Sequence, residues 1–124
     1  MSRFAAASGV KLSDHYEMTR IRADIIARCD VEDGCDAILF PSVPIVPPRL
    51  GDLVAEQAYY ATNARAYRNA WVVNALDRCA ISIPCGTPDG PPVGLTLMAR
   101  TGQDSALLSL AEGLEDVIKH RVGS

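Results

Sequence analysis

The chain of 124 residues is 48% apolar and 22% charged, and its formal net charge at pH 7 is −3. This composition is typical of one globular domain, here residues 1–124, and argues against disorder and against the basic surface of a nucleic-acid-binding protein. No apolar run approaches the roughly 20 residues of a membrane span, and no apolar leader with a processing site opens the sequence. We therefore expect a cytoplasmic protein with neither nucleic-acid nor membrane partners.

The cysteines favour free thiols over a metal site or disulfides. Cys29 and Cys35 are six positions apart, as are Cys79 and Cys85. This spacing is wider than the two to four intervening residues usual at zinc sites. We expect buried or half-buried thiols in a reducing compartment, and no metal ion or cofactor.

The first part of the chain is predicted to be helical. Residues 2–8 are rich in alanine and precede Gly9, a pattern typical of a short helix that ends at a glycine. Apolar side chains then recur every three to four residues, which predicts a helix from Asp14 to Cys29 with Asp14 as its N-cap.

A short strand and a proline-rich segment follow. Residues 37–40 form an apolar run that Pro41 ends, which predicts the first strand. Prolines at 41, 44, 47 and 48 enforce extended backbone without a hydrogen-bonded ladder. The segment Pro41–Pro48 is interpreted either as a rigid loop at the rim of a pocket or as a recognition segment for an aromatic groove.

Two further helices are predicted over residues 52–61 and 63–76. Tyr59 and Tyr60 are adjacent, so both cannot face inward on a helix. Trp71 lies on an apolar stripe of the second helix. A core position is the expected role, and a platform for a ligand is the alternative.

Residues 80–99 contain the clearest strand signals. Two apolar runs, residues 80–84 and 93–99, flank eight residues that include three prolines and two glycines, which predicts a hairpin or β-arch. Polar and apolar residues alternate weakly in both runs, so we expect helices on both faces of the sheet. Asp104 then N-caps a predicted amphipathic helix over residues 105–120, and the whole is an α/β architecture.

The common catalytic motifs are missing from the sequence. It contains no glycine-rich phosphate loop, no His-Glu metal motif and no GxSxG turn. His15 and His120 lie near predicted helix ends. Neither Lys11 nor Lys119 lies in a predicted buried strand, where desolvation would make a lysine a general base.

Two segments nevertheless resemble the C-terminal part of the amidase signature enzymes. They are CDAILFPSVPIVPP, residues 35–48, and RNAWVVNALDRCAISIPCGTPDGPPVGLTLMARTGQDSALLSLAEGLE, residues 68–115. A strand running into a proline-rich loop, an asparagine-containing helix, a Pro-Cys-Gly strand end, a Pro-Val-Gly-Leu strand and a final helix follow in the family's order. Residues 2–26 also resemble the preceding segment of these enzymes, and the chain looks closest to bacterial amidases that act on small amides.

The resemblance implies a partial amidase-signature fold, with a few-stranded mixed sheet covered by helices and no cofactor. Family members hydrolyse a carboxamide with a serine nucleophile, a second serine in a cis peptide and a lysine, beside a Gly-Gly-Ser-Ser-Gly oxyanion hole. That stretch is absent here, and neither Ser42 nor Ser82 lies in a glycine-rich turn. The chain is interpreted as the C-terminal portion of an amidohydrolase, without catalytic residues and inactive alone.

By the same analogy, four polar residues beside the Pro41–Pro48 loop are expected to face a small amide substrate in the intact enzyme. They are Ser42, Thr62, Asn63 and Asn69. For each of them, a structural role as helix cap, loop support or solvent contact is the alternative.

A second hypothesis is a non-catalytic module that stands alone. Strands 80–84 and 93–99 lack the neighbours they would have in the parent fold, and unpaired strand edges favour pairing. Such a module would form a homo-oligomer or pair with a separately encoded N-terminal part of an amidase.

Overall fold

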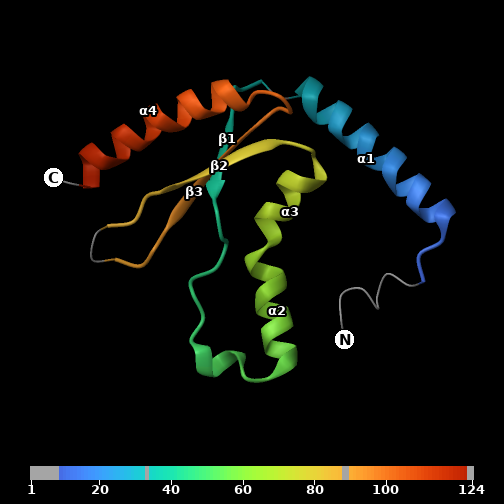
Figure 1. Ribbon diagram of the computed structural model, residues 1–124, viewed down its shortest axis with the longest axis horizontal. Helices are drawn as coiled ribbons and strands as arrows, with labels where there is room; N and C mark the ends of the chain where they lie inside the picture. Colours follow the sequence, from blue (N-terminus) through green and yellow to red (C-terminus); the bar gives the residue numbers. More distant parts are fainter. Residues whose placement is uncertain (1–8, 33, 88–89, 123–124) are drawn as a thin grey trace. The chain divides into compact units, whose positions relative to one another are not determined.

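The computed structural model describes residues 9–32, 34–87 and 90–122. Its elements follow in the order α1, β1, η2, α2, α3, β2, β3, α4 (Figure 1). The chain divides into two compact units, residues 1–34 and 35–124, and each is described by itself. The helix predicted over residues 2–8 lies outside the described residues. No helix in the described ranges is both long and apolar enough to cross a bilayer.

The first unit contains one helix, α1, Leu12–Glu32. It confirms the predicted helix and extends it at both ends, so Asp14 lies in the first turn instead of at the N-cap. Arg20 and Asp24 form an exposed ion pair one turn apart, with 3.4 Å between nitrogen and oxygen. Met18 and Ile25 are exposed, so apolar packing contributes little to the helix within this unit.

The second unit is built on a three-stranded sheet with β3 in the middle. Its strands are β1 (Ile38–Pro41), β2 (Cys79–Pro84) and β3 (Gly94–Ala99). Both pairings are antiparallel. The predicted hairpin of two strands around the proline-rich turn is therefore confirmed, and so is the first strand.

One face of this sheet is covered by α4, Asp104–Val122 (Figure 1). Side chains alternate along a strand, so Leu97 and its partners Leu39 and Ile81 share this face. The core forms where helix and sheet meet, and Leu97 at its centre is only 2% exposed. Its buried members are Ile83, Leu97, Ala99, Leu107 and Ala111.

The opposite face of the sheet is covered only in part. Thr96 and Met98 are buried there, at 8% and 6% exposure, whereas Ile38 is 39% exposed. Residues of α3, Arg68–Ala75, face the strands across a small cavity. The expectation of helices on both faces is thus met fully by α4 and partly by α3.

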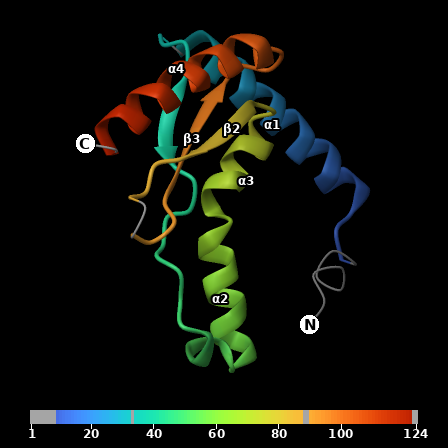
Figure 2. The same ribbon diagram turned by 60° about the vertical axis from the view of Figure 1, so that its left-hand side comes forward.

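The segment between β1 and β2 departs from the predicted helix boundaries. After the proline-rich loop come a 3-10 turn, Leu50–Leu53, and α2, Glu56–Ala66, which leads into α3 (Figure 2). A break at Thr62 was the expectation, and it is wrong, because the chain bends at Tyr67 instead. The Tyr67 amide donates to the Asn63 carbonyl at 3.1 Å, so helical hydrogen bonding continues past Thr62.

Two expectations about burial are also wrong. Trp71 is 51% exposed and is not a core residue. Its neighbour Ala70 lies on the α3 side that lines the cavity, and adjacent helical residues point about 100° apart. Cys35 is exposed, whereas Cys29, Cys79 and Cys85 are half-buried free thiols as expected.

Neighbouring leucines on α4 test how this helix packs. We expect Leu107→Ala to lower the free energy of unfolding by about 2–5 kcal/mol, because Leu107 is 4% exposed and its loss leaves a cavity in the core. The control Leu108→Ala removes a side chain that is 58% exposed and should change stability by at most about 0.5 kcal/mol. Urea unfolding of both variants measures the difference, and equal losses would contradict the packing described here.

Candidate functional site

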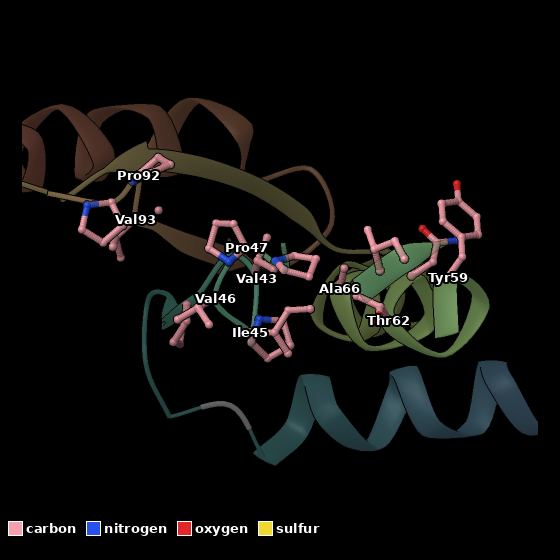
Figure 3. A pocket seen from close by; sticks show the side chains of 16 residues that line it. Val43, Ile45, Val46, Pro47, Tyr59, Thr62, Ala66, Pro92 and Val93 are labelled. Carbon is pink, nitrogen blue, oxygen red and sulfur yellow. The ribbon is translucent and has the colours of Figure 1, made fainter. Parts of the chain in front are cut away.

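The larger cavity of the second unit lies between the proline-rich loop, α2 and the segment that enters β3. Its volume is ≈ 560 Å³, within the usual range of small-molecule sites. Figure 3 shows Val43, Ile45 and Val46 of the loop on one side and Thr62 of α2 on another. We call this cavity the proline-rich pocket.

The loop keeps its place because both its sequence and its anchors restrict it. Prolines 44, 47 and 48 fix the φ angles of their own residues. Where the loop leaves β1, the Asn69 side-chain Nδ2 donates to the Pro41 carbonyl at 2.7 Å. The Ser42 amide donates to the Gly94 carbonyl at 2.8 Å, which ties the loop to β3. The pocket wall is thus held in place before any ligand arrives.

The chemistry of the proline-rich pocket is almost entirely apolar. None of the described residues that line it carries a charge, and its polar side chains come from Tyr59, Thr62 and Asn63 of α2. Burying an ionised group without a partner is strongly unfavourable. The pocket therefore suits an uncharged apolar group that makes hydrogen bonds on its α2 side.

A smaller cavity of ≈ 220 Å³ lies on the sheet face opposite α4, next to a cluster of three hydroxyl groups. Thr96 Oγ1 donates to Ser42 Oγ at 2.8 Å, and Ser42 Oγ also hydrogen-bonds Ser82 Oγ. Gly94 makes room for this cluster, since a Cβ there would lie 2.8 Å from Ser42 Oγ and 3.1 Å from Ser82 Oγ. We call these groups the hydroxyl cluster and the space beside them the hydroxyl cavity.

The structure places the four predicted site residues at three different points. Thr62 and Asn63 line the proline-rich pocket together with the loop, as the sequence suggested. Ser42 lies in the hydroxyl cluster and lines the other cavity. Asn69 supports the loop through its bond to Pro41. That any of the four binds substrate stays a prediction.

The hydroxyl cluster was not predicted from the sequence as a unit. Ser82 and Thr96 are the hydroxyl residues in two otherwise mainly apolar strands, and their pairing across the hairpin follows from the register. That signal was present in the sequence. The contact with Ser42 was not, because it depends on β1 pairing with β3 across 54 positions of sequence.

The described part of the second unit lacks a pair of serine and lysine of the kind that amide hydrolysis by serine requires. Its one lysine, Lys119, is on α4, which packs on the face of the sheet opposite the hydroxyl cluster. Lys119 Nζ pairs with Glu115 Oε1 at 3.3 Å on an exposed surface. Within this unit, Ser42 and Ser82 therefore face no lysine that could act as their base.

Comparison with known proteins decides the family. Residues 4–108 match the family model described as Amidase. The chain belongs to the amidase family. The 2-amino-5-chloromuconic acid deaminase of Comamonas testosteroni is 34% identical over 103 residues, which cover 78% of this chain and 22% of that protein. A glutamyl-tRNA(Gln) amidotransferase subunit from Sulfolobus acidocaldarius is 29% identical over 126 residues, covering 95% of this chain and 25% of its own.

A solved structure supports the same fold. The corresponding glutamyl-tRNA(Gln) amidotransferase subunit from Thermotoga maritima matches 83% of this chain with a TM-score of 0.52 and 19% identity. The match covers 27% of that protein. This amidase chain therefore spans about a quarter of the length of the relatives it matches, and its α/β fold corresponds to part of theirs.

Gly94 gives a direct test of the hydroxyl cluster. We expect Gly94→Ala to destabilise the protein by about 1–3 kcal/mol, because the added methyl group would overlap the Ser42 and Ser82 hydroxyls. Gly113→Ala on α4 is the control, since nothing lies within 4 Å of a Cβ there. Alanine in a helix should make that variant more stable by about 0.5–1 kcal/mol. Thermal unfolding that shows the same change for both would refute the close approach at Gly94.

Proposed function

We propose that this chain is the C-terminal portion of an amidase-signature amidohydrolase, where it supplies a wall of the pocket for the acyl part of a small amide. The observation that carries the proposal is the proline-rich pocket, which is uncharged and of substrate size, in a member of the amidase family. The coverage of about a quarter of each relative fits a portion of a longer enzyme. The localisation proposed with it is the cytoplasm.

The catalytic groups are proposed to come from the remainder of such an enzyme. Hydrolysis of an amide by a serine needs a base within hydrogen-bonding reach of its hydroxyl, and a set of donors for the developing oxyanion. Ser42 and Ser82 bond to each other and to Thr96, and no lysine faces them in the described part of the second unit. This chain would therefore bind and orient the substrate without carrying out the bond-breaking step.

The substrate class follows from the lining of the pocket. With no charged side chain to pair with among the described lining residues, the pocket favours a neutral acyl group, either aromatic or branched, over an amino acid such as glutamine. Thr62 and Asn63 would supply hydrogen bonds at the α2 side. Ser42 and Asn69 would act by holding the loop that forms the opposite wall.

A titration with 3-phenylpropionamide tests this assignment on the ¹⁵N-labelled full chain. We expect shifts at the amides of Val43 and Thr62, none on adding glutamine, and at least about tenfold weaker binding by Val43→Asp, because the new carboxylate is desolvated by the ligand. Val117→Asp is the matched control: Val117 on α4 is 53% exposed and Val43 is 51% exposed. Equal binding of glutamine, or equal losses in the two variants, would contradict the proposal.

A stand-alone pairing module is the second candidate. The outer strands β1 and β2 each have a partner on one side only among the described strands. Several large apolar side chains of this unit are exposed as well, Leu39 and Trp71 among them at 50% and 51%. Unpaired edges next to exposed apolar residues favour association with a second copy or with a separately encoded amidase half.

Light scattering on the purified chain distinguishes this candidate. A pairing module should show a mass that rises from one chain to two with concentration, and lysine in place of Leu39 should prevent the rise by placing a charge beside the β1 edge. Lysine in place of Leu108, which is 58% exposed on α4, is the control. A constant monomer mass at high concentration would count against pairing with itself.

A further inference from the structure

We infer that the hydroxyl cluster is a hydrogen-bond donor site for a small uncharged carbonyl compound, which would occupy the hydroxyl cavity. This site is separate from the proline-rich pocket: the hydroxyl cavity lies on the sheet face between the strands and α3. The inference goes beyond the proposed function and stands or falls without it.

The count of hydroxyl hydrogens carries the inference. Ser42, Ser82 and Thr96 have three O–H groups, and the two hydrogen bonds of the cluster use two of them. Thr96 donates to Ser42, so the remaining hydrogen belongs to Ser82 if Ser42 donates to it, and to Ser42 if the donation runs the other way. In both arrangements, one serine O–H stays available, and no acceptor for it lies in the described part of the chain.

The available donor faces the cavity. All three hydroxyl residues line it, and Ser82 is exposed while Thr96 at the inner end of the cluster is buried. Hydrogen bonds in a chain polarise one another, so the terminal O–H is a better donor than an isolated serine hydroxyl. A ligand oxygen placed beside Ser82 would complete the chain Thr96–Ser42–Ser82.

The rest of the lining restricts the ligand. Phe40, Ala70, Val73 and Ala80 supply apolar contacts, and no described residue that lines the cavity is charged. A carboxylate would have no cation to neutralise it, whereas a ketone or carboxamide oxygen accepts the hydrogen without bringing a charge. The volume of ≈ 220 Å³ is about seven times the ≈ 30 Å³ that a water molecule occupies. It therefore holds a molecule of roughly that many heavy atoms at most.

A matched pair of probes tests the inference on the ¹⁵N-labelled full chain. Butanone and 2-methylbut-1-ene have the same shape, and only butanone has a carbonyl oxygen. We expect butanone to shift the amides of Val73, Ser82 and Thr96, and to bind at least fivefold more tightly than the alkene. Propionate, of similar size but charged, should cause no saturable shift at these amides.

Variants at the donor complete the test. Ser82→Ala should reduce butanone affinity at least fivefold and leave the alkene unchanged, and Ser82→Cys, which keeps the side-chain volume with a weaker donor, should give the same preference if Ser82→Ala does not fold. Ser109→Ala is the control, because that hydroxyl bonds Ser105 within α4.

Three results would overturn the inference. One is unchanged butanone affinity in both Ser82 variants, and another is equal affinity for ketone and alkene. The third is an absence of shifts at Val73, Ser82 and Thr96, including the case of a chain without a dispersed spectrum, because the cavity exists only in the folded chain. Shifts confined to Val43 and Thr62 would place butanone in the proline-rich pocket, which contradicts this site and leaves the proposed function intact.

Discussion

The two-sided use of β3 is the constraint on which the rest of the second unit depends. As the central strand, it is hydrogen-bonded to both β1 and β2. Leu95, Leu97 and Ala99 point to the α4 side, whereas Gly94 and Thr96 point to the side with the hydroxyl cluster. A shift in register of one residue would exchange these two sets, placing a hydroxyl in the core and leucines beside Ser42. Burial of Leu97 therefore also fixes the geometry of the polar face.

The proline-rich pocket follows from the same strand. The loop leaves β1 at Pro41 and is tied to β3 through the bond from the Ser42 amide to the Gly94 carbonyl. Beyond that anchor, prolines limit the backbone, so a loop that lacks a hydrogen-bonded ladder still forms a defined wall opposite α2. This arrangement accounts for an apolar, preformed cavity in a chain that is only part of the length of its amidase relatives.

The sequence was most informative where local pattern and tertiary packing agree. The turn between β2 and β3 excludes a helix by its prolines, and α4 repeats leucines at helical spacing, so both were predicted correctly. The resemblance to amidases, which rests on the residues around that hairpin, was correct at the level of the family.

Prediction failed where the outcome depends on contacts between distant segments. Trp71 lies on an apolar stripe, yet α3 meets the sheet through Ala70 and Val73, so the largest side chain stays exposed. The bend at Tyr67 has no capping residue to mark it in the sequence. The bond between Ser42 and Ser82 joins residues 40 positions apart, a proximity that local patterns do not encode.

The central claim is that this amidase chain supplies a binding wall and not the catalytic groups. Release of ammonia from 3-phenylpropionamide by the purified 124-residue chain measures it most directly. The account predicts no release above that of a parallel preparation from cells without the gene. Hydrolysis at an enzyme-like rate that is abolished by Ser42→Ala or Ser82→Ala would contradict it, because a working nucleophile would then lie in the hydroxyl cluster.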